Sequence, residues 1–230
     1  MQLTEYSSRK PYVLVPSIDS VTCSVNLIFE EREKIPENFS LIIGDAIHNL
    51  RSALDILVID IFKSRGLEVD GRIGFPIAQS ENAFEKIIRK GEFKKLDMGI
   101  LEIFRNFKPF RSGSVLLAGL HDLDIEDKHK RLLFAVAYSD FQTLMQFVIP
   151  KKGTVHGSSA VGNIIRVGTG FGITPYDHFD IDKEYDVKIQ VVFSESVFEG
   201  ATVANILKDM CGIVEEIVQS IEDHLRIKHI

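Results

Sequence analysis

Cysteine and tryptophan are scarce in this sequence, which contains only Cys23 and Cys211 as thiols and no tryptophan at all. Neither cysteine lies in a CxxC pair or at a metal-ligand spacing, so a disulfide framework and a zinc knuckle are not expected. Two isolated thiols are typical of a reducing compartment. The sequence therefore predicts a cytoplasmic protein without a metal site.

Long apolar runs are also missing. The most apolar stretch, Ile56–Phe62, is interrupted by Asp60 and is far shorter than the roughly 20 residues that a membrane-spanning helix needs. The first residues, MQLTEYSSRKPYVLV, contain no apolar core of the kind found in signal peptides. The sequence predicts neither a membrane span nor a signal peptide.

Basic residues are fewer than acidic ones, 27 against 33, which leaves a formal net charge of −6. Affinity for nucleic acid depends mainly on neutralising phosphates, so RNA is not a favoured partner of this chain. Of the 230 residues, 45% are hydrophobic and 26% are charged, a composition typical of folded globular proteins. We therefore expect a folded domain with a substantial core rather than a general polyanion binder.

The N-terminal half changes from a period of two to a helical period. Alternation over Val21–Phe29 predicts a half-buried strand, and Tyr12–Val15 predicts a shorter one. Helical periodicity then runs from about Asn38 to Lys63. Further helices are predicted at Ser80–Arg89, Lys94–Phe104, Ser114–Leu123 and Ile125–Tyr138. The last two either are separated by a helix restart at Asp124 or form one long helix with a polar middle.

The period returns to two after Phe141. Strands are predicted at Gln142–Ile149, Thr154–Val155, Asn163–Val167 and Tyr185–Phe193. An amphipathic helix from about Phe198 to Ile227 closes the chain and presents a candidate surface for a homodimer or other homo-oligomer.

Together these elements predict one α+β domain over residues 1–230. Its helical core would cover about 38–138, and its strands would lie within about 12–30 and 141–194. In this arrangement a helical bundle, with long helices in its N- and C-terminal halves (the latter at about 198–227), packs with an antiparallel sheet.

Polar side chains gather on one face of the predicted helix at 38–63. A helical wheel places Ala46, Ile47, Leu50, Ala53, Leu54 and Leu57 on the apolar face, and Asp45, His48, Asn49, Arg51, Ser52 and Asp55 on the opposite one. Ile56 and Ile59 continue the polar face one turn later, which indicates partial burial. Buried polar groups need partners; the alternative is an ordinary solvated face.

A second group of polar residues lies in the segment at 120–133. His129 falls within the apolar stripe of that segment, whereas Asp127, Lys128 and Arg131 point elsewhere. Histidine suits proton transfer because its unperturbed pKa lies near neutrality; the alternative is a core histidine with satisfied hydrogen bonds.

The two segments are expected to pack against each other and to enclose a polar niche. The candidate catalytic residues are His48, Arg51 and His129, and the candidate binding residues are Asp45, Asn49, Asp55, Asp127, Lys128 and Arg131. The GTGFG stretch at 168–172 lacks a complete GxGxxG pattern, so it predicts a turn, and no cofactor is expected.

Three stretches of this chain resemble the signatures of an uncharacterised family of bacterial and phage proteins. They are GDAIHNLRSALDIL at 44–57, Phe75-Pro76-Ile77, and LHDLDIEDKHKRLL at 120–133. The family signatures read GD-x-x-HNLRSALDHL, FPI and N-x-x-DKHR. The resemblance covers about a third of the chain and implies no particular activity.

The family pattern RSALDH is in turn similar to the R-x4-H motif of HEPN-type ribonucleases, which are small, generally dimeric helical domains that cut RNA without a metal. This resemblance implies that Arg51 would stabilise the phosphate. The histidine position is Ile56 in this chain, so His48 or His129 would have to transfer the proton. The sequence thus predicts a binding or structural module, with a HEPN-like RNase or a degenerate RNA-binding relative as the alternative.

Overall fold

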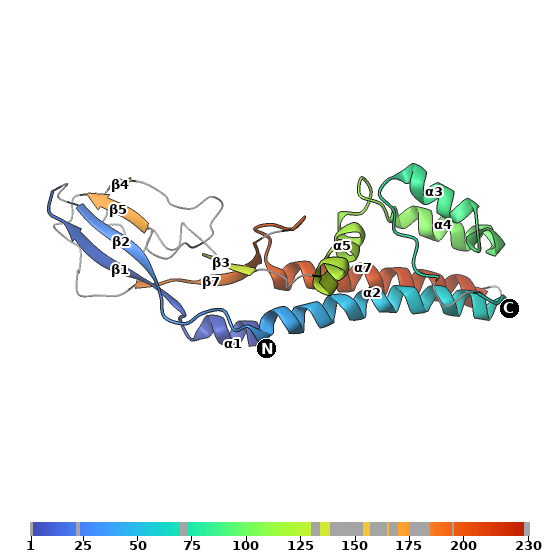
Figure 1. The fold of residues 1–230 in the computed structure, drawn as a ribbon, viewed down its shortest axis with the longest axis horizontal. Helices are drawn as coiled ribbons and strands as arrows, with labels where there is room; N and C mark the ends of the chain where they lie inside the picture. Colours follow the sequence, from blue (N-terminus) through green and yellow to red (C-terminus); the bar gives the residue numbers. More distant parts are fainter. Residues whose placement is uncertain are drawn as a thin grey trace. The chain divides into compact units, whose positions relative to one another are not determined.

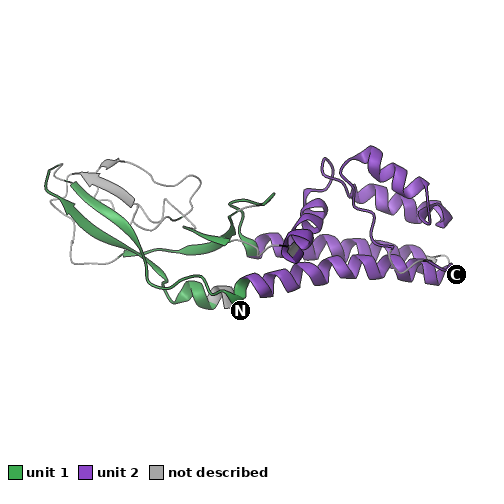
Figure 2. Ribbon diagram, in the orientation of Figure 1, with its two compact units in different colours: residues 1–39, 133–203 green, residues 40–132, 204–230 purple. Residues whose placement is uncertain are grey.

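The computed structural model describes residues 2–21, 24–69, 73–129, 134–138, 154–156, 165, 170–174, 185–194 and 196–227. These residues form α-helices and antiparallel sheets, which confirms the α+β class (Figure 1). They group into two compact units, each built from two separate stretches of chain (Figure 2). Unit 1 comprises Met1–Phe39 and Leu133–Val203, and unit 2 comprises Ser40–Leu132 and Ala204–Ile230. The single-domain organisation stays a prediction.

Unit 1 contains the β-structure. Strands β1 (Tyr12–Asp19) and β2 (Ser24–Glu31) form an antiparallel hairpin (Figure 1). They belong to a five-stranded sheet in the order β4-β5-β2-β1-β6, in which β4 is Thr154–His156, β5 is Gly170–Thr174 and β6 is Tyr185–Asp186. A second sheet pairs β3 (Phe134–Tyr138) with β7 (Ile189–Phe193).

The alternating sequence of β2 explains its place in the sheet. Val25, Leu27 and Phe29 are buried, whereas the residues between them are partly accessible. The other edge of β2 pairs with β5, from Val25↔Ile173 to Ile28↔Gly170. This pairing confirms the prediction that the N-terminal strand joins strands that follow Phe141 in the sequence.

Unit 1 also begins with a helix that the sequence analysis did not predict, α1 (Gln2–Ser8). Its Tyr6 is fully buried, and the ring meets Phe39 edge-on with centroids 5.7 Å apart. The Tyr6 hydroxyl donates a hydrogen bond to the Glu33 carbonyl oxygen at 3.0 Å. Burial, followed by the Glu31 and Glu33 carboxylates, raises the pKa of Tyr6 to about 12. The phenol therefore remains a hydrogen-bond donor at neutral pH.

Unit 2 is helical. Its helices are α2 (Asn38–Ser64), α3 (Glu81–Arg89), the 3-10 turn η1 (Phe93–Lys95), α4 (Met98–Phe107), α5 (Val115–His129) and α7 (Val203–Ile227), the first and last of which begin next to the unit boundaries. The bounds of α2 match the prediction closely. Gly66 ends it with a φ of 64°, where glycine carries no steric penalty, and donates its N–H to the Lys63 carbonyl oxygen at 2.9 Å.

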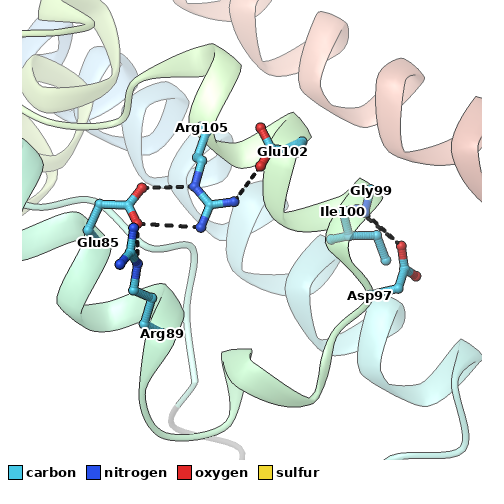
Figure 3. Close-up of polar contacts among 7 residues, drawn as sticks. All are labelled: Glu85, Arg89, Asp97, Gly99, Ile100, Glu102 and Arg105. Atoms are coloured by element: carbon cyan, nitrogen blue, oxygen red, sulfur yellow. Dashed lines mark hydrogen bonds and ion pairs between the residues drawn. The ribbon is translucent and has the colours of Figure 1, made fainter.

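Charged side chains connect α3 to α4 (Figure 3). The Glu85 carboxylate accepts hydrogen bonds from Arg105 Nε at 2.8 Å and from Arg89 Nε at 2.7 Å, and Arg105 Nη1 also contacts Glu102 at 2.6 Å (Figure 3). The hydrogen bond from Arg105 is the main reason that the pKa of Glu85 lies below its usual value. The side chains of this helix pair are therefore held in one arrangement.

Asp97 caps α4 and joins three parts of unit 2. Its Oδ1 accepts the N–H groups of Gly99 at 3.1 Å and Ile100 at 3.3 Å (Figure 3). Oδ1 also lies 2.9 Å from His224 Nε2 of α7, and Oδ2 lies 2.9 Å from Arg65, just beyond α2. One carboxylate thus ties the first turn of α4 to α7 and to the end of α2.

Two helix predictions are wrong at their ends. The predicted helix at Ile125–Tyr138 is helical over its described residues up to His129, but Phe134–Tyr138 is strand β3. All five residues of β3 pair with β7, and burial of Val136 and Ala137 accompanies this pairing, so a partner distant in sequence overrides local helical periodicity. The helix predicted at Lys94–Phe104 begins only at Met98, after its cap Asp97.

Some predictions fall outside the described residues or are shifted slightly. The predicted strand at Gln142–Ile149 lies outside the described residues, and of Asn163–Val167 only Ile165 is described; its N–H donates to the Val136 carbonyl oxygen at 2.7 Å. The closing helix begins at Val203 rather than Phe198. Asp124 does not interrupt α5, so the alternative of one continuous helix holds as far as His129.

Candidate functional site

The site is built where α2 meets α5 within unit 2. Nδ1 of His48, from α2, lies 2.9 Å from Oδ1 of Asp124, from α5. One turn earlier on α2, the Asp127 carboxyl group lies so close to Gly44 that a methyl group at that position would overlap it. These contacts confirm the prediction that the segments around Asp45–Asp55 and Asp124–Arg131 pack against each other.

Four side chains form a hydrogen-bonded chain at this seam, which we call the His48 network: His48, Ser52, Asp124 and Lys128. The Asp124 side chain is only 5% exposed, whereas those of His48 and Lys128 are 54% and 52% exposed. Lys128 Nζ donates to Asp124 Oδ2 at 2.6 Å, and Nε2 of His48 lies 3.4 Å from Ser52 Oγ. A nearly buried carboxylate thus holds two accessible nitrogen groups.

The protonation of Asp124 follows from this arrangement. Burial acts to raise the pKa of Asp124, but the hydrogen bonds from Lys128 and His48 outweigh it and hold the pKa below its usual value. The carboxylate is therefore ionised at neutral pH. It orients the imidazole ring by accepting a hydrogen bond from Nδ1–H, which leaves Nε2 as the acceptor nitrogen.

Further along α2, Arg51 and Asp55 bind the loop that contains Phe75. Arg51 Nη1 lies 2.6 Å from Asp55 Oδ1, and Nη2 donates to the Phe75 carbonyl oxygen at 3.3 Å. The same Asp55 oxygen accepts the Phe75 N–H at 2.7 Å. A side chain at Gly74 would meet the Asp55 carboxyl group, so this glycine allows the close approach of the loop.

The helical wheel of α2 assigned several residues to the wrong face. Arg51 was assigned to the polar face, yet its side chain is only 11% exposed, while Ala53 of the predicted apolar face is exposed. Ile56, expected to continue a partly buried face, is also exposed. The buried side of α2 carries Ile43, Ile47, Leu54, Val58 and Ile61. Arg51 is shielded because the Phe75 loop contacts a flank of the helix that a wheel treats as open.

His121 was missed in the sequence analysis. It is half-buried on α5, and its Nδ1 is buried with no hydrogen-bond partner among the described residues. Burial first, and the nearby Arg51 guanidinium second, lower the pKa of His121. Its position within the apolar run VLLAGLHDL was the available signal, since a polar group in such a run lies partly in the core.

The outer part of the seam is acidic. Burial raises the pKa of Asp127, and the carboxylates of Asp45 and Asp124 raise it further. Asp45 and Asn49 are exposed on α2. Among the described residues, three carboxylates, those of Asp45, Asp124 and Asp127, therefore gather around the His48 network.

The structure divides the candidate site residues into two groups. His48, Asp127 and Lys128 come together at the seam, whereas Arg51 and Asp55 form a separate pair under the Phe75 loop. The His129 side chain and all of Arg131 lie outside the described residues.

The described residues contain neither a metal-binding cluster nor a helix that could span a membrane. Among the described residues, no group of three histidine, cysteine, aspartate or glutamate side chains is arranged to hold a metal ion. No described helix is both long and apolar enough to cross a bilayer.

The lowered pKa of His121 predicts a loss of stability in mild acid. The unfolded chain binds the proton of this histidine more tightly than the folded one, so stability is full above the unfolded pKa, about 6.5, and falls as pH decreases through it. Urea denaturation at about pH 7.5 and about pH 5 should show a smaller loss for His121→Gln than for the wild type. Equal losses in both proteins would contradict the assignment. Asp124 does not interfere, because its contribution is complete above its ordinary pKa of 3.8 and is lost only as pH falls from there through the lowered pKa, below the range tested.

Comparison of this chain with protein-family models, curated proteins and solved structures finds no match.

Proposed function

We propose that this chain is a binding module whose ligand niche is the His48 network at the seam of α2 and α5. The observation that carries the proposal is the contrast in exposure between Asp124, at 5%, and its two partners, at 54% and 52%. A purely structural network would bury all of its members. Here the buried carboxylate fixes the orientation of two groups that remain open to solvent, so little side-chain entropy is lost when a ligand binds.

The charge at the niche supports a neutral or cationic polar ligand. Among the described residues, the carboxylates of Asp45, Asp124 and Asp127 lie near the Lys128 ammonium, and the guanidinium of Arg51 is already paired with Asp55. A phosphate would be repelled by these carboxylates, and in the part of the chain that the structure describes the arginine of this helix, Arg51, is already occupied. An ammonium group would be attracted by the same carboxylates.

Membership of the uncharacterised bacterial and phage family also belongs to this proposal. It is supported by the meeting of all three quoted stretches in one unit: 44–57 contacts 120–133 through His48 and Asp124, and it contacts the Phe75 stretch through Arg51 and Asp55. A cytoplasmic location and homo-oligomerisation through α7 stay predictions, and sedimentation velocity tests the latter.

The alternative, a HEPN-like metal-independent RNase or RNA-binding relative, requires an arginine that can reach a phosphate. Arg51 is instead held by Asp55 and the Phe75 carbonyl oxygen, and Ile56, at the histidine position, is exposed and cannot transfer a proton. General acid–base catalysis contributes about 10²–10⁴-fold in rate, so its absence leaves weak cleavage at most.

We therefore expect little or no cleavage of single-stranded or structured RNA by the purified protein in the presence of EDTA. The variants Arg51→Ala, His48→Ala and His129→Ala should leave this background unchanged. Robust cleavage that disappears with Arg51→Ala and with one of the histidine changes would contradict the binding-module proposal. It would also identify the histidine that transfers the proton.

The binding proposal is tested by NMR on the imidazole ring of His48, whose resonances are assigned with a His48→Gln variant. Titration with ethanolammonium should shift the His48 resonances saturably, and Asp45→Asn should weaken this response. Acetate and a short oligouridylate should produce no such shift. A response to acetate or to the oligonucleotide would overturn the proposed ligand class, and no response to any probe would assign the network a structural role.

A further inference from the structure

Three members of the His48 network lie in the order that activates a nucleophile. Asp124 Oδ1 contacts His48 Nδ1 at 2.9 Å, and His48 Nε2 faces Ser52 Oγ at 3.4 Å. The two ring nitrogens thus have different partners, a carboxylate on one side and a hydroxyl on the other. This is the arrangement in which a carboxylate orients a histidine base and the histidine accepts the proton of a serine.

The helix geometry brings these groups together without a loop. Ser52 follows His48 by four residues on α2, so the two side chains are neighbours on one face. Asp124 reaches the far side of the ring from α5. The 3.4 Å separation of Ser52 and His48 is longer than a good hydrogen bond, and such contacts tighten when a substrate is bound.

A cation stands beside the same carboxylate. Lys128 Nζ binds Asp124 Oδ2, whereas His48 binds Oδ1, so the ammonium and the imidazole flank a single side chain. The Lys128 side chain is half-exposed, and its hydrogen bond helps to keep the shared carboxylate ionised beside the imidazole ring.

We propose that Ser52 is the nucleophile of an acyl-transfer site that acts on small neutral or cationic esters. Ser52 Oγ attacks the ester carbonyl carbon while its proton moves to His48 Nε2. The bond from that carbon to the alcohol oxygen then breaks, and the departing oxygen takes the proton from His48. Water repeats the sequence on the acyl-serine and releases the acid. This inference rests on the proposed function, because it needs the niche to be open to a small molecule.

The probe for this site is a neutral alkyl fluorophosphonate, from which an activated serine hydroxyl displaces fluoride. We expect one covalent adduct per chain by intact mass spectrometry, mapped to Ser52 by peptide sequencing. Ser52→Ala should abolish the adduct, and His48→Gln should slow labelling by about 100-fold or more, as expected for loss of a general base.

Ser64→Ala is the matched control, because Ser64 lies on the same helix but its hydroxyl donates to the Ile61 carbonyl oxygen at 2.8 Å. This variant should be labelled at the wild-type rate. Ser52→Ala and His48→Gln are also checked by thermal denaturation, so that unfolding is distinguished from loss of reactivity. Absence of labelling in the folded wild type, labelling at another residue, or labelling unaffected by His48→Gln would overturn the proposal. If His48 still responds to ethanolammonium in that case, the binding module survives without the nucleophile.

Discussion

Replacing Asp55 with alanine should lower the free energy of unfolding by about 3 kcal/mol. This is the low end of the range of about 3–5 kcal/mol for removing one partner of a buried ion pair, chosen because Asp55 itself is 36% exposed. The change leaves the Arg51 guanidinium, only 11% exposed, without its carboxylate, and it leaves the Phe75 N–H without its acceptor. Urea denaturation followed by circular dichroism at neutral pH measures the effect.

Two companion variants separate the charge from the hydrogen bond at this position. Asp55→Asn keeps an acceptor for the Phe75 N–H but removes the charge, so its loss should be intermediate. The double variant Arg51→Met with Asp55→Leu removes both charges and should recover most of the stability, because no unpaired ion remains in the core. A loss below about 1 kcal/mol for Asp55→Ala would indicate a pair that behaves like a surface salt bridge. It would also remove the structural reason for the low accessibility of Arg51.

Gly44→Ala should destabilise the protein by about 1–3 kcal/mol, the usual cost of adding a methyl group to a filled contact. The added methyl group would overlap the Asp127 carboxyl group and force that side chain out of its place at the contact of α2 with α5. A loss of stability would be diagnostic of the contact, because Gly→Ala within a helix ordinarily stabilises a protein by roughly 0.5–1 kcal/mol. Urea denaturation again measures the effect. The NMR signal of the His48 ring should also change as its contact with Asp124 is displaced.

An Asp127→Ala background should reverse the effect of Gly44→Ala. Without the carboxyl group the new methyl group has space, and the helix propensity of alanine then dominates, so the second change should stabilise. The double-mutant cycle should therefore give a coupling free energy of about 1–3 kcal/mol, within the range for residues in contact. Additive effects would show that the two residues do not touch.

Periodicity in the sequence was sufficient for the elements that bury one face. The strand β2 and the helix α2 lie where alternation and the 3.6-residue pattern predicted them, because Val25, Leu27 and Phe29, and then Ile43 and Ile47, each repeat at the period of their element. Mixed polar and apolar residues in two helices also predicted the contact between α2 and α5.

Periodicity failed where a distant segment changed the environment. Helical spacing in the stretch that contains Phe134–Tyr138 was overruled by pairing with β7, more than fifty residues later in the sequence. The wheel of α2 left Arg51 on the polar face, because nothing local shows that the loop at Phe75 returns to cover that flank.

The sequence by itself determined the α+β class, the limits of the long helix α2 and the presence of His48, Asp127 and Lys128 near one contact. Only the tertiary structure decided how these groups divide: Arg51 and Asp55 became a half-buried brace for the Phe75 loop, while Asp124 joined His48, Ser52 and Lys128 into an accessible network. The physical reason is that helix and strand patterns depend on neighbours a few residues apart. The partner of a polar group depends on which distant backbone or side chain occupies the space beside it, and local periodicity carries no information about that.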